Sequence, residues 1–182
     1  MGIFDFFKKK KDERHYDPTN ITIRDLGKEY IFEYKIETWT VTAVFEYDWG
    51  DNYFTREFII KNGAIEKFLA IEDDGGLTVT LSEKVKIRKL GDKVCDYIDA
   101  NEKPPKKITL EGVTYYLEEK SPGFCKEIDA ENWEELISYD YLDEEEEKVL
   151  SVEQFGDEEF KVSKGIVIHE TAISNILPMA DN

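Results

Sequence analysis

The sequence has few of the residues that commonly build reactive centres. Cys and His occur only twice each in 182 residues. Cys95 and Cys125 form no CxxC pair, so we expect free thiols in a reducing compartment. His15 and His169 stand far apart with no second ligand nearby, which argues against a zinc site of ordinary spacing. The sequence therefore predicts no bound metal.

The common catalytic and phosphate-binding motifs are also missing. The chain contains no GxSxG turn, no GxxxxGK[ST] loop and no GxGxxG loop. Residues 73–76 (DDGG) predict a hairpin turn rather than a calcium loop, because they lack alternating oxygen ligands and a distant bidentate Glu. We assign no catalytic residue and no cofactor, and a non-enzymatic protein is the preferred interpretation.

Positive charge and long apolar runs are scarce as well. The 24 Lys and Arg residues face 41 Asp and Glu residues, which gives a net charge of −17. Such a charge repels phosphate, so no nucleic-acid partner is expected. No apolar run approaches the ~20 residues that span a bilayer, and no secretory hydrophobic region begins the sequence. We therefore expect a cytoplasmic protein.

Acidic residues gather between Asp129 and Glu159, where fourteen of them face a single Lys. One interpretation is a solvated surface that maintains solubility, and the other is a docking surface for a basic protein partner. Five consecutive acids, at residues 143–147, predict a charged hairpin end that prevents edge-to-edge association, or a weak cation site. The acidic residues that we assign to partner binding are Asp143, Glu144, Glu145 and Glu146.

The first residues combine apolar and basic side chains. Four apolar residues come first, and four lysines follow them directly: Ile3, Phe4, Phe6, Phe7, Lys8, Lys9, Lys10 and Lys11. Phe rings at the acyl boundary and lysines on anionic head groups would give peripheral membrane contact, and the inner membrane is the expected location. The alternative is a free tail, or one that docks on the protein's own surface. Residues 1–20 are predicted to form this tail and a linker.

Aromatic residues are plentiful, with eleven Phe, ten Tyr and three Trp, and they favour β-strands. In WTVTAVFEY, strict alternation predicts one face made of Trp39, Val41, Ala43, Phe45 and Tyr47. Three further aromatics, Trp49, Tyr53 and Trp133, flank turns and are candidates for partner binding. Core packing is the alternative for them, and an aromatic groove between two β units is another.

An internal repeat is the clearest pattern. Residues 66–87 and 147–168 align without gaps at an offset of 81, with seven identities that include Leu69/Leu150 and Glu72/Glu153. Such similarity predicts two copies of one supersecondary unit. Asn62-Gly63 and Asp143-Glu144 are the predicted hairpin tips.

The predicted fold is all-β: a tandem duplication of a small antiparallel unit, sandwich or barrel-like, with a short helical or turn connector. The first β unit covers residues 21–90, the connector 91–107 and the second unit 108–178. Val94, Tyr97 and Ile98 recur at helical spacing in the connector, and Pro104-Pro105 end any helix there.

The strand pairs around NWEELISYDYL and EKVLSVEQFG, and around TREFII and EKFLAIEDDG, resemble the bacterial domain-of-unknown-function family numbered 4178. The resemblance covers most of residues 21–178. It implies a small cytoplasmic protein without an established activity or known site residues.

Two functions remain open from the sequence. The preferred one is a non-enzymatic binding or adaptor protein, acting at the cytoplasmic membrane surface. The alternative is a small enzyme or small-ligand-binding protein that uses a cleft between the two β units. Clustered inward-facing carboxylates, or His169 in a deep pocket, would favour the alternative, whereas shallow clefts would favour the adaptor.

Overall fold

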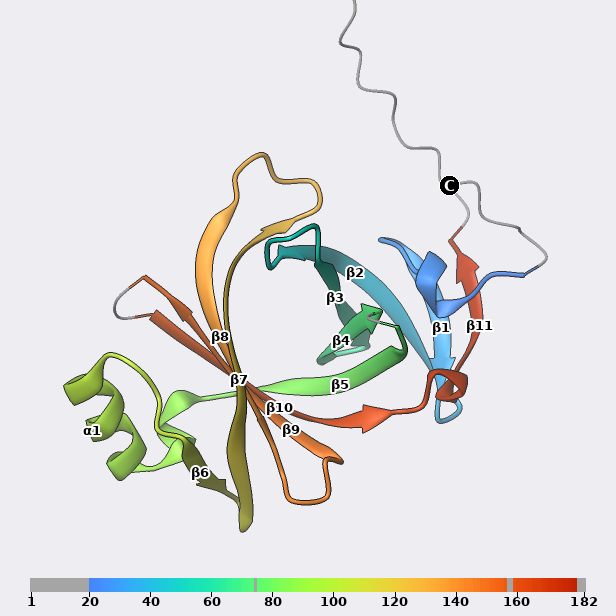
Figure 1. Cartoon of the computed structure of the whole chain (residues 1–182). Helices are drawn as coiled ribbons and strands as arrows, with labels where there is room; N and C mark the ends of the chain where they lie inside the picture. The colour runs from blue at the N-terminus through green and yellow to red at the C-terminus, as the bar shows by residue number, and fades with distance from the viewer. Residues whose placement is uncertain (1–19, 74, 157–158, 180–182) are drawn as a thin grey trace, which may run out of the picture.

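The computed structural model describes residues 20–73, 75–156 and 159–179 (Figure 1). The membrane-contact residues predicted at the N-terminus, and His15, lie outside these residues. The described chain is mostly antiparallel β-structure with one α-helix, which confirms the all-β class. Its elements are β1 (Tyr30–Tyr34), β2 (Glu37–Asp48), β3 (Phe54–Asn62), β4 (Ile65–Asp73), β5 (Leu77–Val85), α1 (Asp92–Asn101), β6 (Lys107–Leu110), β7 (Val113–Glu127), β8 (Glu134–Leu142), β9 (Lys148–Phe155), β10 (Glu159–Ile168) and β11 (Ile173–Pro178), with short 3₁₀ helices at Ile23–Asp25, Ile87–Leu90 and Glu170–Ala172.

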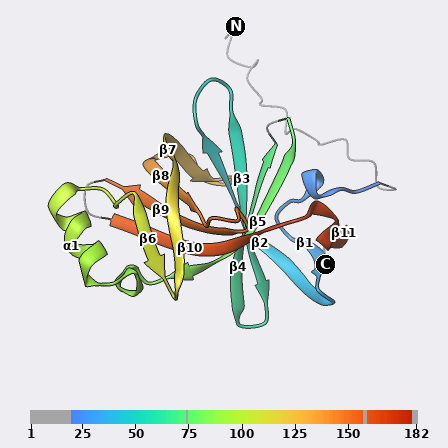
Figure 2. The same cartoon turned by 60° about the horizontal axis from the view of Figure 1, so that its bottom comes forward.

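Eight of the strands close into a ring. The sheet order is β11-β1-β2-β3-β4-β5-β10-β9-β8-β7-β6, and β2 also pairs with β7. Two four-stranded meanders, β2–β5 and β7–β10, therefore join through β5–β10 on one side and through β2–β7 on the other. Figure 2 shows α1 and β6 at one end of the molecule and β1 and β11 at the opposite end. The last strand, β11, pairs with β1 of the first unit.

Each meander packs on its own hydrophobic core. The first core lies between β1–β5, β11 and the 3₁₀ helix at Ile23–Asp25, and the second between β5–β10 and the turn that precedes α1. Leu69 and Leu150, aligned by the repeat, are both fully buried, as predicted. The connector forms α1, in which Ile98 is buried and Tyr97 is exposed.

The same 81-residue offset relates the buried faces of the two meanders. Phe58 and Ile60 on β3 are buried, as are Tyr139 and Tyr141, the residues 81 positions later on β8. The cross-strand register nevertheless differs by two, because Leu69 pairs with Leu81 whereas Leu150 pairs with Lys164. A shift of two keeps every side chain on its own face, since side chains alternate with a period of two.

The first hairpin turn lies one residue later than predicted. Asn62 pairs with Ile65, so the two turn residues are Gly63 and Ala64 rather than Asn62 and Gly63. Only Gly63 has a positive φ, of 57°. This is the pattern of a II′ turn, which needs glycine at its first central position and no positive φ at the second. The second turn lies between β8 and β9, where the N–H of Glu146 donates to the carbonyl of Asp143, so its central residues are Glu144 and Glu145 rather than Asp143 and Glu144.

The prediction that β2 presents one apolar face is wrong. Trp39, Val41 and Val44 face the first core, whereas Tyr47 belongs to a separate small cluster. The register shifts between Val41 and Ala43, because a β-bulge there inserts one extra residue. From the bulge onward, Tyr47 and its neighbours two residues apart point to the opposite face of the sheet.

Candidate functional site

A groove crosses the outer face of the β5–β10 ladder, where the two units meet. Its volume is about 450 Å³. Its floor includes the paired residues Leu81 and Ile166, and its two walls come from the turns and strands of both units. The lining residues are Tyr34, Lys35, Glu37, Trp39, Lys67, Leu81, Ser82, Glu83, Leu110, Glu111, Val113, Tyr115, Lys148, Lys164, Gly165 and Ile166.

The repeat places equivalent residues on both walls of the groove. Lys67 and Lys148 are identical at the offset of 81, and Tyr34 and Tyr115 have the same offset. The groove is therefore a consequence of the paired units, because each unit supplies a tyrosine and a lysine from matching positions.

A strained hairpin turn borders the groove. Lys35 and Ile36, between β1 and β2, both have positive φ, of 49° and 61°. A positive φ is strained for a β-branched residue, and the Ile36 side chain is 102% exposed. Nothing in the turn's own packing explains an apolar residue here, since its side chain contacts no core.

The groove lysines differ in their electrostatic partners. Lys164 Nζ lies 2.5 Å from Glu111 Oε2 and 3.5 Å from Glu83 Oε1, so its charge is compensated. Lys148 Nζ lies 3.9 Å from Asp143 Oδ2. In contrast, Lys67 Nζ lies over the Trp39 ring, 5.8 Å from its centroid, and Lys35 Nζ lies 5.3 Å from the centroid of Tyr34.

Trp39 on the groove wall carries an unsatisfied donor. Its indole N–H is buried and has no hydrogen-bond partner among the described residues. An unpaired buried donor costs about 1–3 kcal/mol, so such groups are rare away from functional or strained places. Trp39 is thus the largest fully buried side chain of the first core, and it also lines the groove with an indole N–H that lacks a hydrogen-bond partner among the described residues.

The interior of the ring, apart from the groove, holds a cluster of carboxylates. Glu57 on β3 and Glu153 on β9 are four strands apart in either direction around the ring. Their charges nevertheless interact, and Glu57 also interacts with Asp140 on β8 and Lys161 on β10. Groups on opposite strands can meet only across the interior, so these side chains face one another there.

Burial in this interior, together with the neighbouring charge of Glu153, raises the pKa of Glu57 to about 8. Burial also raises the pKa of Glu153 and of Asp140. Asp140 accepts hydrogen bonds from Ser151 at 2.8 Å and Ser138 at 3.0 Å, and these bonds favour its charged form. At neutral pH, Glu57 therefore keeps a proton that a solvent-exposed carboxyl would release.

One end of the interior is closed by aromatic side chains. Tyr47 donates a 3.4 Å hydrogen bond to Glu57, and its ring stacks on Trp49 with centroids 5.5 Å apart. Trp49 in turn donates to Thr55 at 2.9 Å and lies directly over Gly123, where any Cβ would come within 2.6 Å of its ring. Cys125 is buried beside them, and burial raises its pKa to about 12, so its thiol stays protonated.

The structure separates the aromatics that were predicted to bind a partner. Trp49 is half-buried against Tyr47, and Tyr53 is half-buried in the β2–β3 turn. Trp133 is exposed, with Lys126 Nζ 4.8 Å from its ring centroid.

The acidic residues of the β8–β9 turn also differ in their exposure. Asp143 is buried, and its carboxylate accepts hydrogen bonds from the backbone N–H groups of Glu147 and Lys148. These bonds close the turn and lower the pKa of Asp143, the bond from Lys148 contributing most. Glu144, Glu145 and Glu146 remain exposed.

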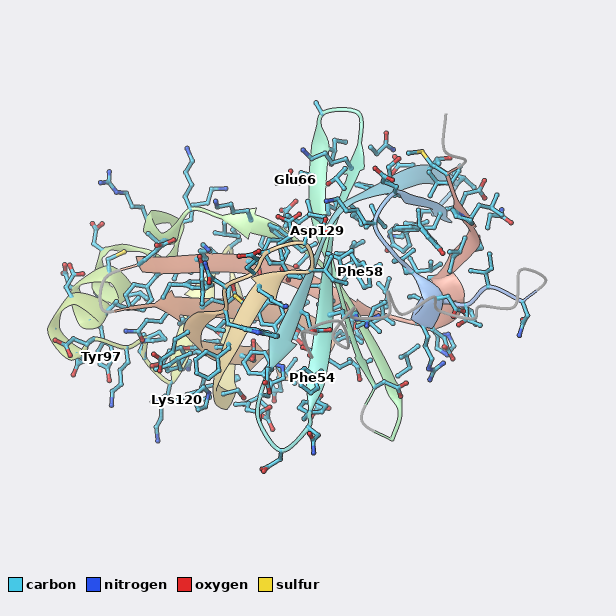
Figure 3. All side chains as sticks on the ribbon, turned by 90° about the horizontal axis from the view of Figure 1, so that it is seen from above. Phe54, Phe58, Glu66, Tyr97, Lys120 and Asp129 are labelled. Atoms are coloured by element: carbon cyan, nitrogen blue, oxygen red, sulfur yellow. The ribbon has the colours of Figure 1, made fainter. Side chains whose placement is uncertain are left out.

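An aromatic surface patch lies at the other junction of the two units, across β3, β2 and β7. Phe54 on β3 and Phe124 on β7 are the cross-strand partners of Asp48 on β2, and each is 47% exposed. Figure 3 shows Phe54 near the β2–β3 end of the molecule, with Phe58 deeper inside. Trp133 beside Lys126 extends this patch, which we call the aromatic patch: Phe54, Phe124 and Trp133.

Sequence reasoning missed the interior residues Tyr47, Glu57 and Asp140 as a group. In a sequence, a carboxylate that alternates with core residues looks solvent-facing, and only the closure of the ring encloses it. The Glu72/Glu153 identity was the available signal, because it marks one face that both copies retain. Burial raises the pKa of Glu72 as well, although its side chain remains exposed at the mouth of the interior.

His169 does not line the groove. It precedes the 3₁₀ helix at Glu170–Ala172, where its ring nitrogen accepts from the backbone N–H of Thr171. Among the described residues, no group of three or more His, Cys, Asp or Glu side chains is placed to hold a metal ion. Within the same residues, no helix is both long and apolar enough to cross a membrane.

These features define an all-β protein with a closed ring of paired meanders and a groove where they join. The chain belongs to the family described as "Domain of unknown function (DUF4178)", whose family model matches residues 27–170. It is similar to an uncharacterized protein of Aquifex aeolicus (strain VF5), with 26% identity over 98% of this chain and 99% of that protein. No solved structure matches the chain.

Proposed function

We propose that this is a non-enzymatic, small-ligand-binding protein whose site is the groove across the β5–β10 ladder. The observation that carries the proposal is the groove itself, at about 450 Å³, with aromatic and charged side chains supplied by both units. Ligand sites typically occupy such junctions, and they combine apolar walls with a few polar groups.

Two further observations support this proposal over a purely structural role for the groove. The unsatisfied N–H of Trp39 and the strained, exposed Ile36 turn both border it, and neither contributes to stability. The clustered carboxylates in the ring interior also favour a ligand-binding protein over a simple adaptor. The proposal covers binding and includes no reaction.

Filling the groove should abolish ligand binding. The test uses 8-anilinonaphthalene-1-sulfonate, whose fluorescence reports entry into an apolar site. Ile166→Trp places a bulky ring on the groove floor, and we expect at least about a tenfold loss of probe affinity.

Val167→Trp is the matched control for that test. Val167 and Ile166 are each 39% exposed on β10, but Val167 points to the other face of the strand and does not line the groove. We expect Val167→Trp to bind the probe like the wild type. Equal affinity in both variants would place the probe elsewhere and contradict the proposed site.

A second candidate function is an adaptor that joins a basic protein partner to an anionic membrane at the cytoplasmic side. The aromatic patch favours it, because exposed aromatic residues are enriched in protein interfaces. Asp48 pairs with Phe54 and Phe124 in the ladders, and Glu135 also pairs with Phe124, which suits a partner with basic residues beside an apolar centre. The exposed Glu144, Glu145 and Glu146 could extend that acidic rim.

The membrane part of this second candidate rests on the N-terminal sequence. Phe4→Ser/Phe7→Ser should reduce pelleting with anionic vesicles at low salt, because the rings would no longer enter the acyl boundary. Each of Lys8 to Lys11 contributes on the order of 1 kcal/mol near a charged surface, so pelleting should also weaken as salt is raised. Cosedimentation measures both effects. Equal pelleting of variant and wild type, or none for either, would remove the membrane from the proposal.

A further inference from the structure

We infer that the groove selects an anionic ligand with an aromatic or apolar body. This inference rests on the proposed ligand-binding function and specifies the chemistry of the ligand. Two sets of side chains carry it: the lysines without carboxylate partners, and the aromatic walls beside them.

The uncompensated cations all lie on the first unit's wall. Lys35 and Lys67 have no ion pair among the residues that the structure describes, whereas Lys164 has two carboxylates within 3.5 Å. Lys148 is intermediate, with Asp143 at 3.9 Å. A ligand anion would thus meet two ammonium groups whose charge no protein group already neutralises.

Aromatic and apolar side chains border the groove at the same place. Trp39 and Tyr34 lie beneath Lys67 and Lys35, so each free cation is already held above a ring. Tyr115 faces them from the second unit, and Leu81 and Ile166 form an apolar floor between the walls. Because these rings and Leu81 are nearly buried and Ile166 is 39% exposed, a ligand can pack its body mainly on Ile166, beside the ring positions, while its charged group contacts the ammonium groups.

The net charge of −17 opposes an anion at long range but not within the groove. At physiological ionic strength, charges interact over about 8 Å before salt screens them. Four lysines and three glutamates (Glu37, Glu83 and Glu111) line the groove, so positive charge is in slight excess there, whereas no acidic residue of 129–159 lines it. Local charge therefore decides which ligand is retained.

Two probes with the same aromatic body separate charge from shape. 8-Anilinonaphthalene-1-sulfonate carries a sulfonate, and N-phenyl-1-naphthylamine lacks it. We expect Lys35→Gln/Lys67→Gln to weaken the sulfonate probe about tenfold, since a charge-assisted contact is lost. The neutral probe should change by no more than about twofold. Lys67→Arg keeps the charge and should retain sulfonate binding, and Lys93→Gln on α1, outside the groove, is the matched control.

The outcomes distinguish this inference from the proposed function. If Ile166→Trp blocks both probes but the lysine variant affects them equally, the groove binds ligands without selecting anions, and only this inference fails. If Ile166→Trp blocks neither probe, the groove is not the site and both proposals fail. Selective loss of the sulfonate probe in the Lys35→Gln/Lys67→Gln variant, with binding retained in Lys67→Arg, supports the inference.

Discussion

Replacing Glu57 with Gln should raise the free energy of unfolding at pH 8 and reduce its dependence on pH. The pKa of Glu57 is raised from 4.5 to about 8, chiefly by burial. Between these values the folded state keeps a proton that the unfolded state has released. The free energy of unfolding therefore falls as the pH rises from about 4.5 through 8. Gln resembles the protonated carboxyl and has no proton to lose.

The size of this effect is bounded by the shift of the Glu57 pKa. The full difference corresponds to at most about 5 kcal/mol, at about 1.4 kcal/mol for each pH unit. The side chain is half-buried and its charge is partly screened by solvent, so we expect about 2–4 kcal/mol of added stability at pH 8. At pH 4 the variant and the wild type should differ little, because both carry a neutral group.

Urea unfolding between pH 4 and pH 9 measures this difference directly. Glu144→Gln, at the exposed β8–β9 turn, is the matched control, and it should leave the pH profile of the wild type unchanged. A profile for Glu57→Gln that runs parallel to the wild type would show that Glu57 is ionised in the folded protein. That result would contradict the enclosed carboxylate cluster.

The all-β class was predictable because alternation and the repeat depend only on side-chain polarity. Leu69 and Leu150 could be placed in matching cores from the offset alone, since burial follows the apolar face of each strand. The two-residue change of register did not disturb that prediction, because it leaves the faces unchanged.

The ring interior could not be predicted, because it depends on two features that leave little trace in the sequence. One is the bulge after Val41, which turns Tyr47 away from the first core. The other is the pairing of β2 with β7, a contact of only four residue pairs between distant segments. Without this closure, Glu57 and Asp140 would lie on a solvent-facing side of one open sheet, since β5 would still pair with β10.

The groove between the units was one of the alternatives considered from sequence, but its residues were not. The aromatics chosen there flank turns at the opposite junction, where Trp133 is exposed and Trp49 closes the interior. The identity of Lys67 and Lys148 was visible in the repeat, whereas Tyr34 and Tyr115 lie outside the aligned residues 66–87 and 147–168. Its meaning required the β5–β10 pairing, which brings the two equivalent walls together.

Gly165 should be the least tolerant position on the groove floor. It pairs with Ser82 in the β5–β10 ladder, whose seven residue pairs join the two units. A Cβ at position 165 would collide with the carbonyl oxygen of Leu81 and lie 2.6 Å from Ser82 Cβ. Backbone atoms cannot move aside as a flexible side chain can, so the ladder itself would have to separate.

We therefore expect Gly165→Ala to lower the free energy of unfolding by about 3 kcal/mol or more, at the upper end of the usual overpacking cost. Gly76→Ala, in the β4–β5 turn, is the matched control. An added Cβ there meets nothing within 4 Å, so the effect should be near zero or slightly stabilising. Thermal and urea unfolding measure both variants. Equal stability of the two would mean that the β5–β10 strands are farther apart than described, and the groove floor would have to be redrawn.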